Sequence, residues 1–218
     1  RRMAPVQPWK GPCSSRQQLL DVARGGTNRS RRLRCFPILE SQIMKTPIPS
    51  TPSAFHTTVC EQLRSARKRV YLASLHIGPA ANQVSVKEHD LLNALAPTQA
   101  PDVKILLDQN RALRPVPMND SIAITSAEAC HQVIPKTTGN LYLLSVLPQI
   151  LQSILPNPHN EVAGVFHIKF CIFDNMLLMT GANLSEEYFD NRTDRYLCIR
   201  DNPLVECFAD MFLALCDH

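Results

Sequence analysis

The chain has 218 residues with 44% hydrophobic content, which is enough for one sizeable core, and a formal net charge of +4. Much of the positive excess lies in the first 40 residues, and the near-neutral remainder argues against a broad nucleic-acid-binding surface. The sequence has no apolar run of the roughly 18 residues that a membrane-spanning helix needs.

Residues 1–40 form a basic segment in which Asp21 is the only acid before Glu40. Frequent arginines, some serines and few acids are typical of a mitochondrial transit peptide, and the alternative is a basic tail without a targeting role. We expect this leader to be disordered. Because the chain begins with Arg1 and not with Met, we also expect it to be incomplete upstream.

The first half of the remaining chain alternates between helical and strand patterns. The stretch AFHTTVCEQLRSARKRV, from residue 54, predicts a helix with one apolar face, formed by Phe55, Val59, Leu63 and Ala66. It leads into a buried strand, VYLASLHIG. A second helix is expected at SVKEHDLLNALA, and DVKILLDQNRALRP predicts a strand followed by a basic loop. Residues 116–138 are weakly periodic and receive no assignment.

The second half predicts more strands. LYLLSVLPQILQSILP, residues 141–156, is interpreted as a core strand and a packed helix, and the alternative is a surface that dips into a bilayer. FHIKFCIFDN and MLLMTGANL predict paired strands joined by a tight turn at Asp174 and Asn175. A short helix capped by Ser185, a strand at DRYLCIR and a helix with Asn202 as cap and Pro203 at its first position follow. The alternation predicts an α/β sandwich, a mixed sheet with helices on both faces.

The strand FHIKFCIFDN, residues 166–175, carries a histidine and a lysine that apolar residues surround. Since side chains alternate across a strand, His167 and Lys169 share one face with Val165, Cys171 and Phe173. A buried lysine is costly without an anion or another specific partner. We therefore expect a negatively charged group to bind at this face.

His167, Lys169 and Asp174 spell H-x-K-x-x-x-x-D, and Gly181 and Asn183 follow in GAN. This pattern resembles the HKD motif of the phospholipase D superfamily. The surrounding stretch HIKFCIFDNMLLMTGANLSEEYFDNRTDRY is similar to the first HKD motif of the mitochondrial CDP-diacylglycerol–glycerol-3-phosphate 3-phosphatidyltransferase family, and the resemblance covers about residues 54 to 216. It implies that residues 41–218 form one half of a phospholipase D-like α-β-α sandwich, a mixed β-sheet flanked by helices.

The residue types in this motif suit phosphoryl chemistry. A neutral imidazole can attack phosphorus and leave again, so His167 is the candidate nucleophile, and Lys169 can hold the phosphate oxygens. Asn183 can donate an amide hydrogen bond to the same phosphate, with Gly181 allowing close approach of the backbone. Asp174, the motif's remaining catalytic candidate, is expected to fix the turn at the strand end.

Further roles are assigned by resemblance or left open. The resemblance implies a later carboxylate that orients the histidine, and Asp194 is the candidate. Arg192 and Arg195 either bind substrate phosphate or are solvated. His56, His76, His89, His131 and His159 are interpreted as structural. The eight cysteines are scattered without metal-ligand spacing, so we expect no metal site and no cofactor.

The resemblance implies a complete reaction. CDP-diacylglycerol and sn-glycerol 3-phosphate would give phosphatidylglycerophosphate and CMP through a phosphohistidine, in phosphatidylglycerol and cardiolipin biosynthesis at the matrix side of the mitochondrial inner membrane. Members of the family carry two HKD motifs, and this sequence contains one. We therefore expect a fragment that is inactive alone, with a homodimer as the other arrangement. The alternative functions are a phospholipase D-type phosphodiesterase or hydrolase and a non-catalytic lipid-binding half.

Overall fold

The computed structural model describes residues 49–78, 85–96, 98–118, 121–134, 139–146, 164–200 and 202–217. The predicted leader, residues 1–40, and the helix expected within residues 147–156 lie outside these ranges. Of the helices within them, none combines the length and the apolar character needed to cross a bilayer.

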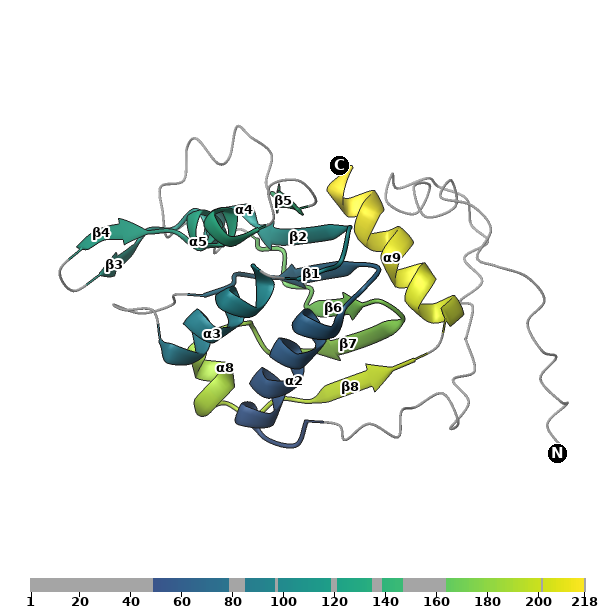
Figure 1. The fold of residues 1–218 in the computed structure, drawn as a ribbon. Coiled ribbons are helices and arrows are strands. Elements are labelled where there is room, and N and C mark those ends of the chain that lie inside the picture. The colour runs from purple at the N-terminus through teal and green to yellow at the C-terminus, as the bar shows by residue number, and fades with distance from the viewer. Residues whose placement is uncertain are drawn as a thin grey trace, which may run out of the picture.

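The centre of the fold is a six-stranded mixed sheet, shown in Figure 1, with the strand order β5-β2-β1-β6-β7-β8. Neighbouring strands β5, β2 and β1 are parallel, and β6, β7 and β8 continue the sheet in antiparallel pairs. The bounds of the strands are β1 Val70–Ser74, β2 Val103–Asp108, β5 Gly139–Leu144, β6 Phe170–Phe173, β7 Met176–Thr180 and β8 Tyr196–Ile199. A separate hairpin consists of β3 Val116–Met118 and β4 Ser121–Ile124.

Helices cover both faces of this sheet, and each face has its own apolar cluster. The first cluster joins one face to α2 Pro52–Ser65, α3 Val86–Leu95, α5 Ser126–Val133 and α8 Glu186–Asp190. The second joins the other face to α9 Asn202–Cys216, which crosses the sheet in Figure 1. The predicted α/β sandwich is therefore confirmed.

The first helix follows local sequence rules. Thr51 accepts a hydrogen bond from the Ala54 amide at 3.1 Å, and Pro52 occupies the first turn, where its missing N–H costs nothing. Phe55, Val59 and Leu63 are fully buried on the predicted face. Burial of this stripe between the sheet and its neighbours, more than intrinsic propensity, stabilises the helix.

Some predicted elements differ in extent or kind. Strand β6 begins at Phe170, so His167 and Lys169 precede it in an extended segment without ladder pairing. Within the strand the predicted alternation holds, since Cys171 and Phe170 belong to clusters on opposite faces. The stretch after β2, predicted as a loop, begins with a short helix, α4 Gln109–Ala112.

The predicted cap of α8 is wrong in its mechanism. The Ser185 side chain makes no capping hydrogen bond. Instead Glu88 of α3, itself buried, accepts one from the Glu186 amide at 3.0 Å. The first turn of α8 is thus satisfied by a carboxylate from another helix, which fits the positive end of a helix. The segment left without assignment, residues 116–138, holds β3, β4 and α5.

The strand directions bring distant segments to one edge of the sheet. Ala73 near the carboxyl end of β1 pairs with Phe170 at the start of β6, and Thr180 at the end of β7 pairs with Tyr196 at the start of β8. The chain therefore enters or leaves the sheet at this edge just beside residues 74–78, 108–112, 164–169, 180–184 and 192–195. The predicted site residues, apart from Asp174, lie in these segments.

Candidate active site

His167 and Lys169 lie immediately before β6. The His167 side chain is exposed, whereas Lys169 is only 7% exposed and donates from Nζ to the His167 carbonyl oxygen at 3.1 Å. Partial burial lowers the pKa of His167, Lys169 lowers it further and Asp108 opposes the change. The ring is therefore neutral near pH 7 and has the lone pair that a nucleophile requires.

The Lys169 side chain is largely shielded from solvent. Burial lowers the pKa of its ammonium group, and the charge of Asp194 opposes this shift. A buried cation with one backbone acceptor keeps hydrogen-bonding capacity for a ligand. An anion bound at this edge would gain a strong interaction, because the local environment contains little water to screen it.

Asp108, which ends β2, fixes the segment that carries His167. Its carboxylate is fully buried and accepts hydrogen bonds from the amides of Phe166 at 2.7 Å and Arg111 at 2.8 Å. The first bond ties the chain just before His167 to the end of β2. Sequence reasoning missed this residue, although an acid that ends an apolar strand and begins a helix is a usable signal.

Gly181 and Asp194 are in direct contact. A Cβ atom added at Gly181 would lie 2.7 Å from Oδ2 of Asp194 and 3.0 Å from Oδ1. The absence of a side chain at Gly181 therefore makes room for the Asp194 carboxylate. The sequence had predicted that this glycine allows close approach to a phosphate. Asp194 also accepts from the Arg195 amide at 2.6 Å.

The negative charge of Asp194 partly offsets the lowering of the Lys169 pKa by burial. Its charge raises the pKa of that lysine, whereas the carboxylate that raises the pKa of His167, among the described residues, is Asp108. The predicted orientation of His167 by Asp194 stays a prediction. Asn183 lies two residues after Gly181, and its Oδ1 atom is buried without a hydrogen-bond partner in the described part of the chain.

Asp174 lies at the opposite edge of the sheet. Its carboxylate accepts hydrogen bonds from the amides of Arg67, Lys68 and Arg69 at 2.7–3.1 Å. These contacts hold the connection between α2 and β1 against the β6–β7 turn. Because strand β6 separates it from His167, Asp174 does not join the catalytic candidates in space.

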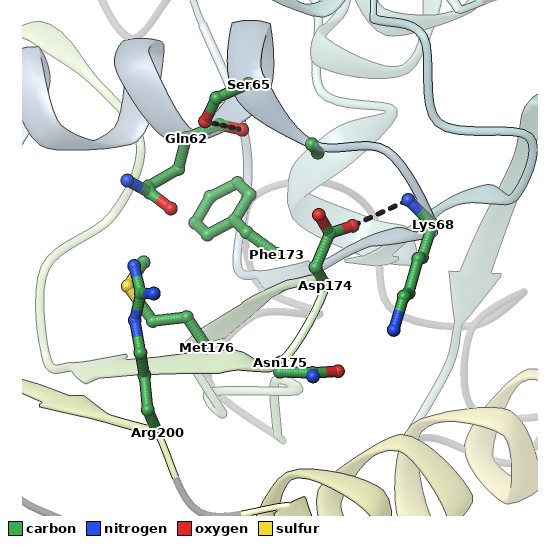
Figure 2. Close-up of a pocket in the computed structure, with 9 residues that line it drawn as sticks. Gln62, Ser65, Lys68, Phe173, Asp174, Asn175, Met176 and Arg200 are labelled. Carbon is green, nitrogen blue, oxygen red and sulfur yellow. Dashed lines mark hydrogen bonds between the residues drawn. The ribbon is translucent and has the colours of Figure 1, made fainter.

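A pocket of about 280 Å³ surrounds this turn, as Figure 2 shows. Asp174 directs its carboxylate to the Lys68 backbone there, and Arg200 approaches from the end of β8. The pocket lies at the edge opposite His167, and its carboxylate is already engaged. We therefore place the candidate active site at the other edge, where the titratable and unpaired groups gather.

The remaining candidates have ordinary surroundings, with one exception. Arg192 is exposed, donates to Glu187 at 3.1 Å and lies over the Tyr188 ring, which agrees with a solvated role. His56 contacts the Lys87 carbonyl oxygen at 2.9 Å. His76, in contrast, is 5% exposed, and neither ring nitrogen has a partner within the described ranges. The ring of this predicted structural histidine is therefore not satisfied by hydrogen bonds within the described ranges.

The described residues contain no group of three or more histidine, cysteine or carboxylate side chains arranged to hold a metal ion. The groups that the structure brings together at the candidate site are His167, Lys169, Asn183 and the carboxylates of Asp108 and Asp194. An imidazole nucleophile beside a buried cation and an amide suits displacement at a phosphorus atom.

Comparison with known proteins agrees with this chemistry. The family model described as "Cardiolipin synthase, PLD-like domain" matches residues 59–216. A protein of Dictyostelium discoideum named "Probable CDP-diacylglycerol--glycerol-3-phosphate 3-phosphatidyltransferase" is 36% identical over 71% of this chain and 26% of its own length. Mitochondrial proteins of the same enzyme name from Gallus gallus and Homo sapiens are each 32% identical over 77% of this chain. The chain spans 30% of the length of each of these two relatives.

Solved structures share the fold. The phosphatidylserine synthase of Haemophilus influenzae matches with a TM-score of 0.56 and 22% identity, over 74% of this chain and 34% of that one. NucT from Helicobacter pylori matches with a TM-score of 0.51 and 15% identity, over 74% and 86% of the two chains. At these identities the likeness establishes the architecture alone.

Proposed function

The chain belongs to the PLD-like domain family of cardiolipin synthases, and from this membership we propose that it takes part in phosphatidyl transfer from CDP-diacylglycerol to sn-glycerol 3-phosphate. The products are phosphatidylglycerophosphate and CMP. The observation that carries the proposal is the exposed His167 beside the buried Lys169 at one sheet edge, in a chain whose relatives bear this enzyme name.

In the first step, a ring nitrogen of His167 forms a bond to the phosphorus that carries diacylglycerol. The bond from this phosphorus to the bridging oxygen breaks, and CMP leaves. Lys169 and the Asn183 amide bind the non-bridging oxygens, whose charge they stabilise in the transition state. The neutral state of His167 near pH 7 supports this role.

In the second step, the hydroxyl oxygen of glycerol 3-phosphate attacks the same phosphorus, and the bond to His167 breaks. The hydroxyl proton passes to a base, which in the two-motif arrangement is a second histidine. This base comes either from a second HKD half or from another copy of the chain. His167, Lys169 and Asn183 therefore provide one half of the site.

The mitochondrial names of the vertebrate relatives support a mitochondrial location. We further propose that the site faces the matrix-side surface of the inner membrane. There the chain would meet its lipid substrate as it lies in the bilayer. The proposed substrates are a lipid and a small phosphate ester. The near-neutral charge of the chain after residue 40 gives no support for nucleic acid as a further partner.

The test uses the 218-residue chain, with and without a second HKD half, in detergent micelles with CDP-diacylglycerol labelled on the lipid phosphate. Release of CMP and labelled phosphatidylglycerophosphate that depend on glycerol 3-phosphate support the proposal. A labelled lipid adduct on the protein that acid cleaves identifies the phosphohistidine, and His167→Ala should abolish it. His131→Ala, which removes an exposed histidine of α5, is the matched control.

Two other outcomes contradict the proposal. Labelled phosphatidic acid formed without acceptor indicates a phospholipase D-type hydrolase. Lipid binding with neither an adduct nor CMP release, when the second HKD half is present, indicates a non-catalytic half. If His167→Ala leaves the measured activity unchanged, His167 is not the nucleophile.

A further inference from the structure

His76 and Asn183 are brought together by a single bridge outside the main sheet ladder. Ile77 and Leu184 form a parallel β-bridge, and the Gly78 amide donates to the Leu184 carbonyl oxygen at 3.0 Å. His76 and Asn183 directly precede the bridged residues. Neighbouring strands lie about 4.8 Å apart, so the two residues stand side by side at the sheet edge that carries His167.

Both neighbours bury polar atoms that lack partners. The two ring nitrogens of His76 and Oδ1 of Asn183 make no hydrogen bond within the described part of the chain. His76 is 95% buried, since only 5% of it is exposed. A buried polar atom without a partner is destabilising, so folded proteins rarely leave several of them together unless a ligand completes the site.

The charges around His76 indicate the kind of ligand. Burial, Arg111 and Lys169 together lower the pKa of His76 to about 3, so the ring is neutral near pH 7. No carboxylate contributes to this shift. A neutral imidazole offers one N–H donor and one acceptor nitrogen. The ring N–H of His76 and the Nδ2 group of Asn183 are donors beside the cations Arg111 and Lys169, and they suit an anion with several acceptor oxygens, such as a phosphate group. The unpaired Oδ1 of Asn183 is an acceptor and requires a donor of the bound substrate.

We propose that His76 is a phosphate-binding residue of this site, whose ring N–H donates to a non-bridging oxygen of the phosphate that Lys169 and Asn183 bind. The inference deepens the proposed function and rests on it for the identity of the phosphate-bearing substrate. His76 binds and orients the group without forming or breaking a covalent bond. The acceptor nitrogen then faces a hydroxyl or amide group of the bound substrate.

The experiment titrates the 218-residue chain with inorganic phosphate and follows the ring ¹⁵N signals of its histidines. The His76 signals should shift with saturation, because a phosphate oxygen at the ring N–H changes its shielding. His76→Phe keeps the ring volume and removes the donor, so phosphate affinity should fall about tenfold or more. His76→Gln restores an N–H donor and should recover part of the affinity. His131→Phe should bind as the unaltered chain does.

A structural role makes the opposite prediction. If His76 only packs, His76→Phe retains the phosphate affinity, and the His76 signals do not respond to phosphate. Either result overturns the inference. Should His76→Phe fail to fold, the response of the His76 ring signals in the unaltered chain still decides, because a residue that only packs would not respond to phosphate.

Failure of this inference is distinguishable from failure of the proposed function. Phosphatidyl transfer whose KM for CDP-diacylglycerol is unchanged in His76→Phe would support the proposed function and exclude His76 from phosphate binding. Phosphate binding that depends on His76, without phosphatidyl transfer, would support the role of His76 and contradict the proposed substrate.

Discussion

Asp174 offers the sharpest test of how the fold is held, because its carboxylate stabilises a connection far from the candidate nucleophile. It accepts from the amides of Arg67, Lys68 and Arg69, and its own φ of 53° lies in the left-handed region. Asp and Asn tolerate this conformation better than Ala does. Three substitutions therefore separate the hydrogen bonds from the backbone strain.

The expected free energies follow from these contacts. The Arg69 amide is partly buried, and its lost bond costs about 1 kcal/mol, whereas the two exposed amides can turn to water and cost about 0.5 kcal/mol each. Asp174→Gly should thus lose about 2 kcal/mol. Asp174→Ala adds about 1 kcal/mol for the left-handed backbone, and Asp174→Asn, which retains one oxygen, should lose about 1 kcal/mol.

The pH dependence has a definite sign. Partial burial alone would raise the pKa of Asp174, but hydrogen bonds from Lys68, Arg67 and Arg69 together hold it below the usual value. A lowered pKa in the folded state gives stability that is present above the unfolded pKa of about 3.9 and is lost as the pH falls through the folded value. The difference between the unaltered chain and Asp174→Asn should therefore shrink below about pH 4.

Urea unfolding followed by circular dichroism measures these values at pH 7 and at acidic pH. The order Asn, Gly, Ala in increasing loss is the expected outcome. Equal losses for Gly and Ala would refute the strain argument. A gap between the unaltered chain and Asp174→Asn that persists at acidic pH would refute the role of the charge.

Three further predictions concern contacts elsewhere. Gly181→Ala should lower phosphatidyl transfer at least about tenfold in the micelle assay, because its Cβ would displace the Asp194 carboxylate that now lies 2.7 Å away; retained activity would mean that this carboxylate is dispensable. Phe55→Ala should lower the free energy of unfolding by about 3–5 kcal/mol in urea titrations, since the ring is fully buried. Glu88→Ala should lower it by about 2 kcal/mol, because the Glu186 amide loses its acceptor, and a change under about 0.5 kcal/mol would contradict that cap.

The sequence predicted elements whose apolar pattern is strong. The helix with Phe55 and Leu63 on its buried face and the strand with Cys171 and Phe173 both have a periodicity that packing retains. The hairpin and α5 were not predicted, because residues 116–138 carry no comparable pattern. Strand β6 was predicted too long, since its paired residues begin at Phe170, and Lys169 keeps only a long backbone bond of 3.4 Å from the Thr180 amide.

Part of the candidate site could not be predicted from spacing at all. His167, Lys169 and Asn183 lie close together in sequence, so a motif can reveal them. Asp108 and His76 reach the same edge only through pairing of β1 with β2 and β6, and no sequence interval encodes that pairing. A lone histidine after an apolar strand has the pattern of a core residue, and only the structure shows that the ring nitrogens of His76 have no partner among the described residues.

The spacing of H-x-K-x-x-x-x-D has a geometric explanation in this fold. Lys169 directly precedes the four residues of β6, and Asp174 directly follows them. The four intervening residues are therefore the strand itself, which spans the sheet from the edge with the unpaired polar groups to the edge where Asp174 binds three amides. One more residue in β6 would reverse its alternation and turn its buried side chains to the wrong faces. The lysine and the aspartate thus keep a fixed interval because one strand joins a reactive end to an anchored end.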